Sequence, residues 1–237
     1  MAAAVRISNE YERKAVRRFS RGASLGIVAG ILGLVLPIAL ILLATYAPGA
    51  LVPLGNRLVE ATEILAAVGA VMFLFSLLFY RRAFAALRNV DARFWGPSVL
   101  CLLGTLGFLL VILSTVLALE SSNALAVCLN GSPTRAPTCL LSSSPHAAYF
   151  GVAGLVLVWL GGLGIVAGLA LAGGRFQQGT WIAGSASYAL LLLVVAAPLI
   201  AVVLPIRALA YPVLLTPLLI LVAPACVAAG CRRLRGR

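Results

Sequence analysis

The stretch that decides the fold is AAYFGVAGLVLVWLGGLGIVAGLALA, residues 147–172, which contains no Asp, Glu, Lys or Arg. A helix needs about 20 apolar residues to cross the hydrocarbon of a bilayer, and this run exceeds that length. Its apolar residues are continuous rather than alternating, which indicates a helix and not a barrel strand. Similar runs occupy residues 23–46, 58–80, 97–119, 182–204 and 208–229. The sequence therefore predicts an all-α, polytopic membrane bundle of six transmembrane helices.

Composition supports the same class of protein. Of the 237 residues, 62% are hydrophobic and 10% are charged, and the mean hydropathy is +1.11. Soluble domains have about 45–50% apolar and about 25% charged residues. Six spans need about 120 residues, which leaves loops and tails but no soluble domain. The count of six depends on residues 205–207, where we expect a tight hairpin; a single re-entrant segment is the alternative.

The basic residues predict the orientation. The chain has 18 Lys and Arg residues and a net charge of +12. Fifteen of them fall on one side of the predicted membrane, and only Arg57, Arg135 and Arg207 fall on the other. The fifteen are Arg6, Arg13, Lys14, Arg17, Arg18, Arg21, Arg81, Arg82, Arg88, Arg93, Arg175, Arg232, Arg233, Arg235 and Arg237. By the positive-inside rule both termini are cytoplasmic, in a plasma membrane, and the charge is a topology signal rather than a nucleic-acid site.

This topology divides the chain into three parts. Residues 1–22 form a basic, amphipathic cytoplasmic tail, residues 23–230 form the transmembrane domain with an external loop at 120–146, and residues 231–237 form a second basic tail. The first run is far longer than the apolar core of a signal peptide, so we expect it to be retained as an anchor.

The amino-terminal tail is expected to be helical. Asn9 followed by Glu12 fits a capping box, and Tyr11, Ala15 and Phe19 fall on one face. The helix either lies flat on anionic headgroups or extends the first span as a charged, solvated helix. For headgroup binding the candidates are Arg13, Lys14, Arg17, Arg18 and Arg21.

The external loop carries two candidate covalent sites. Cys128 and Cys139 lie on the oxidising side of the membrane, which favours a disulfide, with two free thiols as the alternative. A redox pair is disfavoured because the spacing is not Cys-x-x-Cys. Asn130 begins a glycosylation sequon, although Pro133 follows it directly and the sequon could be a chance occurrence.

Glycines recur at helical spacing in two of the runs. Small residues let transmembrane helices approach closely, either within one bundle or between protomers. The expected helix-packing positions are Gly22, Gly26, Gly30, Gly154, Gly161 and Gly168.

Aromatic residues near the ends of the runs are expected to mark the membrane interfaces. On the basic side these are Tyr80, Trp95 and Trp181. Within the fifth run, Ser185, Ser187 and Tyr188 are most simply hydrogen-bond formers between helices.

Several functions are excluded by missing residue types. His146 is the single histidine, which excludes haem held by two histidines and histidine-based copper or iron sites. None of the six acidic residues falls in the middle of a run, which argues against a proton- or sodium-coupled transporter. No catalytic, cofactor-binding or metal-binding residue is indicated, and we expect no cofactor and no enzymatic activity.

Two short segments carry a resemblance. RGASLG at residues 21–26 and FAALRNVDARF at residues 84–94 resemble an uncharacterised family of archaeal multi-pass membrane proteins. The resemblance implies an archaeal plasma membrane protein, and it implies no activity and no functional residues.

Two classes of function remain. The first is a non-catalytic accessory or scaffold subunit that packs against other membrane subunits, or against a second copy of itself, and contacts anionic lipid on the cytoplasmic side. The second is a channel or transporter for a neutral or apolar small solute, built on the proline-containing fifth and sixth runs.

Overall fold

A computed structural model describes residues 9–40, 55–120, 144–203 and 215–235. Within these ranges there are six long helices and no strand. All six are long and apolar enough to cross a membrane, which confirms the predicted helical bundle. The elements are α1 (Glu10–Gly30), the π-helical η1 (Ile31–Val35), α4 (Gly55–Arg88), the 3-10 helix η3 (Ala92–Phe94), α5 (Trp95–Glu120), α8 (Pro145–Arg175), α9 (Gly179–Val203) and α10 (Thr216–Arg235).

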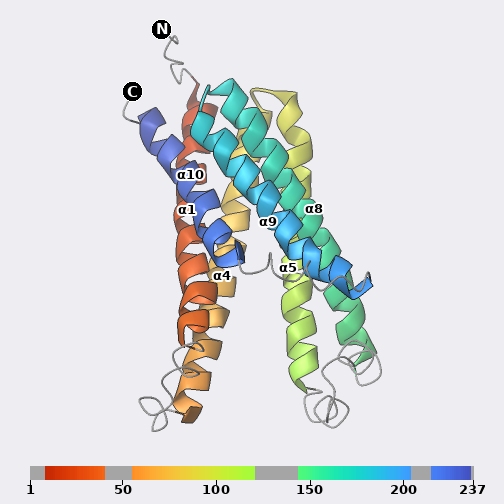
Figure 1. Cartoon of the computed structure of the whole chain (residues 1–237). Helices are drawn as coiled ribbons and strands as arrows, with labels where there is room; N and C mark the ends of the chain where they lie inside the picture. Colours follow the sequence, from red (N-terminus) through yellow and green to blue (C-terminus); the bar gives the residue numbers. More distant parts are fainter. Residues whose placement is uncertain (1–8, 41–54, 121–143, 204–214, 236–237) are drawn as a thin grey trace.

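The helices form a ring in chain order. Each long helix packs against the next one along the chain, and α10 closes the ring by packing against α1 (Figure 1). Because consecutive helices are antiparallel, α1 begins and α10 ends at the same end of the bundle. We call this end the basic end, since it holds the arginines that flank α4, α5 and α8. The hairpin expected at residues 205–207 lies outside the described residues.

Two tight turns close the basic end. Between α4 and α5 the amides of Asn89 and Val90 donate to the carbonyls of Ala86 and Leu87. Between α8 and α9 the chain reverses at Gln177, whose φ of 50° lies in the left-handed region. These turns hold the ends of four helices close together, which places the charged side chains of the loops next to one another.

The hydrophobic core also lies at the basic end. Phe19 of α1 is fully buried at its centre. Its ring lies 5.1 Å from the rings of Phe84 and Trp181 and 5.9 Å from that of Tyr80, centroid to centroid. Phe94 stacks on Phe84 at 6.3 Å. Rings from α1, α4, α9 and η3 thus meet in one cluster; the pairs around Phe19 are tilted or edge-on, and Phe84 with Phe94 is stacked.

Toward the opposite end the helices diverge. Figure 1 shows α1 with α4 on one side and α5 with α8 on the other, with the two pairs separating as they descend. Of all the helix pairs in the described residues, these two have the most extensive contact with each other. A Cβ placed on Gly33 would lie 3.2 Å from the Cα of Gly69, so η1, which continues α1, touches α4 backbone to backbone. A ring contact of 5.2 Å between Phe73 and Phe108 links α4 to α5.

One of the two interpretations of the amino-terminal tail is wrong. From Glu10 onward α1 runs without a break into the first span, and Ala15 and Phe19 are buried in the bundle instead of lying on a membrane surface. From Ala15 onward the apolar face of the tail is therefore an interior face, whereas Tyr11 is 44% exposed. Arg13, Lys14, Arg17 and Arg21 are exposed, as a charged extension of the first span requires.

All six predicted packing glycines lie against neighbouring helices of the same chain. On α1, Gly22 faces Phe79 of α4, and Gly30 faces Ile220 of α10; a Cβ at either position would meet these side chains at 3.2 Å. Gly26 lies between Ser76 and Pro224. On α8, Gly154 and Gly161 face Gly107 and Gly104 of α5, and Gly168 faces the ring of Phe84.

The interface assignment of the aromatic residues is partly wrong. Trp95 is 59% exposed, as an interfacial side chain should be. Tyr80 and Trp181 are 1% and 0% exposed and belong to the core. The error arises because the core sits at the end of the bundle, where a position near a span boundary is also an interior position.

Candidate functional site

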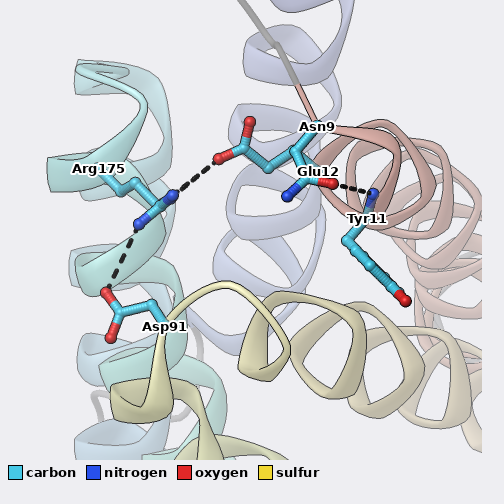
Figure 2. Close-up of polar contacts among 5 residues, drawn as sticks. All are labelled: Asn9, Tyr11, Glu12, Asp91 and Arg175. Carbon is cyan, nitrogen blue, oxygen red and sulfur yellow. Dashed lines mark hydrogen bonds and ion pairs between the residues drawn. The ribbon is translucent and has the colours of Figure 1, made fainter.

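A cluster of three charged side chains joins separate parts of the chain at the basic end. Arg175, the last residue of α8, donates from Nε and Nη2 to Oε1 of Glu12, at 3.1 and 2.9 Å. Its Nη1 lies 3.7 Å from Oδ2 of Asp91 (Figure 2). We call these three residues the ion cluster. It connects α1, the turn between α4 and α5, and the end of α8.

Local structure sets the position of each member. Asn9 caps α1 by accepting from the amide of Tyr11 at 3.1 Å, which starts the helix and puts Glu12 in its first turn (Figure 2). Asp91 caps η3 by accepting from the amide of Arg93 at 3.0 Å. The two carboxylates thus lie at helix starts and the guanidinium at a helix end, which is the favourable arrangement for the helix dipoles.

Burial makes the Glu12 contact strong. Glu12 is only 7% exposed, although it is charged and lies in the tail. A carboxylate taken out of water is costly unless it is paired and hydrogen-bonded. Both contacts of Arg175 to Glu12 use a single carboxylate oxygen, and Arg175 itself keeps 33% of its side chain exposed. The buried carboxylate of Glu12 therefore needs the guanidinium of Arg175 as its partner, whereas the partly exposed Arg175 is also solvated.

The sequence did not reveal this cluster. Half of the capping box is present, since Asn9 does cap α1. The other half is wrong, because Glu12 points to Arg175 instead of returning to the amide of Asn9. Glu12 and Arg175 are 163 positions apart, so their spacing in the sequence does not predict the contact. The available signal was the presence of Glu12 and Asp91 on a side that is otherwise rich in arginine.

Buried polar side chains below the ion cluster connect helices. The hydroxyl of Ser76 donates to the carbonyl of Gly22 at 2.8 Å, and that of Ser185 donates to the carbonyl of Val166 at 2.7 Å. The indole of Trp181 donates to the carbonyl of Val227 at 3.0 Å. These three bonds join α1 with α4, α8 with α9, and α9 with α10.

The predicted interhelical role of the serine and tyrosine residues in α9 is correct for two of them. Ser185 bonds to α8, and the hydroxyl of Tyr188 lies 3.3 Å from that of Tyr80 on α4. Ser187 is the exception, since it donates to Ala183 of its own helix at 2.9 Å. Tyr80 and Tyr188 thus add a direct polar link between α4 and α9.

The remaining predicted site residues are distributed as follows. Lys14 pairs with Glu10 one turn earlier at 2.6 Å, with both side chains well exposed. Arg18 donates to the carbonyl of Arg82 at 2.8 Å and so fastens α1 to α4. Cys128, Asn130 and Cys139 lie outside the described residues. Over the ranges that the structure covers, no group of three or more His, Cys, Asp or Glu side chains could hold a metal ion.

Comparisons of the chain with protein-family models, with curated proteins and with solved structures found no match. The resemblance to archaeal membrane proteins therefore stays a prediction.

Proposed function

We propose that this protein is a non-catalytic accessory or scaffold subunit of a membrane complex. The observation that supports it most is how the polar side chains of the bundle are used. Ser76, Ser185 and Trp181 bond to backbone carbonyls of neighbouring helices, and Arg175 bonds to Glu12. These groups fix one helix to another, which suits a rigid support better than a site that binds and releases a substrate.

The proposal places the basic end in the cytoplasm of a plasma membrane, by the positive-inside rule. Anionic headgroups would then surround the exposed Arg13, Lys14, Arg17 and Arg21. With the basic end in the cytoplasm, the external loop faces the oxidising side of the membrane. If the cell is archaeal, as the resemblance implies, Asn130 remains a candidate glycosylation site of that loop. A Cys128–Cys139 disulfide and a glycan on Asn130 are proposals for that loop, and non-reducing peptide mapping of the native protein would detect either one.

Photo-cross-linking, followed by purification in a mild detergent, tests the subunit proposal. A photo-reactive amino acid at Val68 or Val71 of α4, both exposed and apolar, reports which protein lies against this helix. We expect one membrane protein, or a second copy of the chain, to cross-link in stoichiometric amount. The same probe at Arg232, on the exposed surface of the basic end, is the control. Cross-linking only to lipid from both α4 positions, with a monomeric protein, would contradict the proposal.

The divergence of the helix pairs favours a second function, a channel or transporter for a neutral or apolar solute. Two helix pairs that separate toward one end match the arrangement in which transporters rock one group of helices against another. Single cysteines at Ala66 or Ile112, which share helix faces with the contacting Phe73 and Phe108, would separate the two functions in a variant that lacks the native cysteines. Labelling by a membrane-impermeant thiol reagent requires water between the helix pairs and favours transport. Lack of labelling favours the subunit.

A further inference from the structure

A hollow at the surface of the basic end has both a polar and an apolar lining. It lies where the turn that leads into α5 approaches the last turns of α8, and it has a volume of about 500 Å³. Asp91, Arg93 and Arg175 supply the polar lining, and Ala170, Leu171 and Gly174 supply the rest. This volume is within the range of small-ligand sites, about 300–1,000 Å³.

The two arginines offer donors to the hollow. Arg175 uses Nε and Nη2 for Glu12, but its Nη1 is 3.7 Å from Asp91, beyond hydrogen-bond distance. Arg93 is exposed, and in the described structure its guanidinium has no acidic side chain within ion-pair distance. Two guanidinium edges facing one hollow match the oxygens of a phosphate group.

Asp91 restricts the type of phosphate. Its carboxylate lines the same hollow and repels a second negative charge, so a free multivalent anion fits poorly. A headgroup that carries an ammonium or hydroxyl donor beside its phosphate would match both: the phosphate pairs with the arginines, and the donor faces Asp91. The cap that Asp91 gives to the amide of Arg93 holds the two side chains on the same turn.

The apolar side of the hollow indicates where the ligand comes from. Leu171 is 36% exposed one turn before the end of α8, and Trp95 is 59% exposed at the start of α5. Leucine suits acyl chains, and tryptophan is enriched at the level of the headgroups. Guanidinium groups therefore lie just above a lipid-facing surface, the arrangement of headgroup sites between transmembrane helices.

From these features we infer that the hollow binds one phospholipid molecule. Arg93 and Nη1 of Arg175 hold its phosphate, Asp91 accepts from its headgroup, and Leu171 contacts the start of its acyl chains. The site differs from the exposed basic face of α1, which would attract lipid by charge alone. The inference requires that the helices span a membrane, and it does not depend on the proposed subunit role.

Gly174 allows a direct test. A Cβ added to it would meet no atom within 4 Å, so a side chain at this position begins in open space, and we expect G174L to fill the hollow. Gly179 is equally open and does not line the hollow, which makes G179L the matched control. R93Q removes a phosphate donor, and R88Q removes an exposed arginine at the end of α4 that does not line the hollow.

The experiment is native mass spectrometry of the full chain, released from micelles that contain phosphatidylethanolamine. We expect the wild type, R88Q and G179L to retain one lipid, and R93Q to retain it roughly tenfold less, the effect of losing one charge-assisted bond. G174L should also lower retention, because its side chain occupies the space of the lipid. Equal retention of dioleoylglycerol, which lacks phosphate, would overturn the inference. So would equal loss in R88Q, or displacement of the lipid by inorganic phosphate, which would identify a free anion as the ligand.

Discussion

The two ends of the bundle are held together in different ways. At the basic end, aromatic rings from four elements meet around Phe19, and the ion cluster joins three segments above them. Toward the opposite end the helices pack mainly in pairs, through glycines such as Gly33 and Gly69. Figure 1 shows these pairs separating. One end is a fixed core, and the other is two helix pairs with lipid-facing sides.

This difference assigns separate roles to large side chains and to glycines. Large rings fill space among several helices at once, so they decide how the whole ring of helices is arranged. Glycines let neighbouring backbones approach closely but have no side chain to fill the space among several helices. A substitution in the core should thus destabilise the whole bundle, whereas a lipid-facing substitution in the other half should have little effect.

The largest expected effect is that of Trp181→Ala. Trp181 is fully buried, packs against Phe19 and Phe176, and donates to the carbonyl of Val227. Removing a buried aromatic side chain lowers the free energy of unfolding by about 3–5 kcal/mol. Titration with a denaturing detergent, followed by circular dichroism, measures that free energy.

Trp159→Ala is the matched control for the core substitution. Trp159 lies on α8 and is 39% exposed on the lipid-facing surface. Exposed substitutions change stability by about 0.5 kcal/mol or less. If the two variants lost equal stability, the distinction between a packed end and a loosely packed end would be wrong.

Gly161→Ala should have the next largest effect. A Cβ at this position would overlap the backbone of Gly104, so α5 and α8 would have to separate. Overpacking of this kind costs about 1–3 kcal/mol. For Gly162→Ala on the same helix, the three nearest atoms that the Cβ would meet all belong to the side chain of Leu192, which can shift more easily than a backbone. Near-wild-type unfolding of Gly162→Ala beside a destabilised Gly161→Ala would show that backbone contact holds this pair.

The sequence allowed prediction of the helices but not of their partners. The length of an apolar run is set by the thickness of the membrane, and the positions of the arginines by its two sides. Each of the six spans can therefore be predicted from its own sequence, without its neighbours. Spacing also predicted that Gly161 would pack against another helix. Which helix it meets, and that Glu12 meets Arg175, depends on how distant segments fold together. Tyr80 and Trp181 were misplaced for the same reason, because burial at a span boundary depends on neighbours from other helices.

Arg175→Gln tests the ion cluster. It leaves the carboxylate of Glu12, 7% exposed, without its charged partner, and we expect a loss of about 2 kcal/mol. Adding Glu12→Gln to this variant should recover part of the loss, since the unpaired charge is then gone. The matched control is Lys14→Gln, which breaks the exposed Lys14–Glu10 pair on the same helix and should leave stability almost unchanged, because solvent screens the pair. Additive losses in the double variant would indicate that Glu12 and Arg175 do not interact.

The smallest expected effect separates a hydrogen bond between helices from one within a helix. Ser76→Ala removes the bond from α4 to the carbonyl of Gly22 on α1, and bonds of this kind in membrane proteins contribute about 0.6 kcal/mol. Ser187→Ala removes a bond to Ala183 within α9, whose carbonyl also belongs to the ladder of the helix, so we expect almost no change. Comparing the unfolding free energies of the two variants isolates the interhelical bond, because both lose the same hydroxyl. A larger loss for Ser187→Ala would mean that the α1–α4 contact at the basic end is held by packing against Gly22 alone.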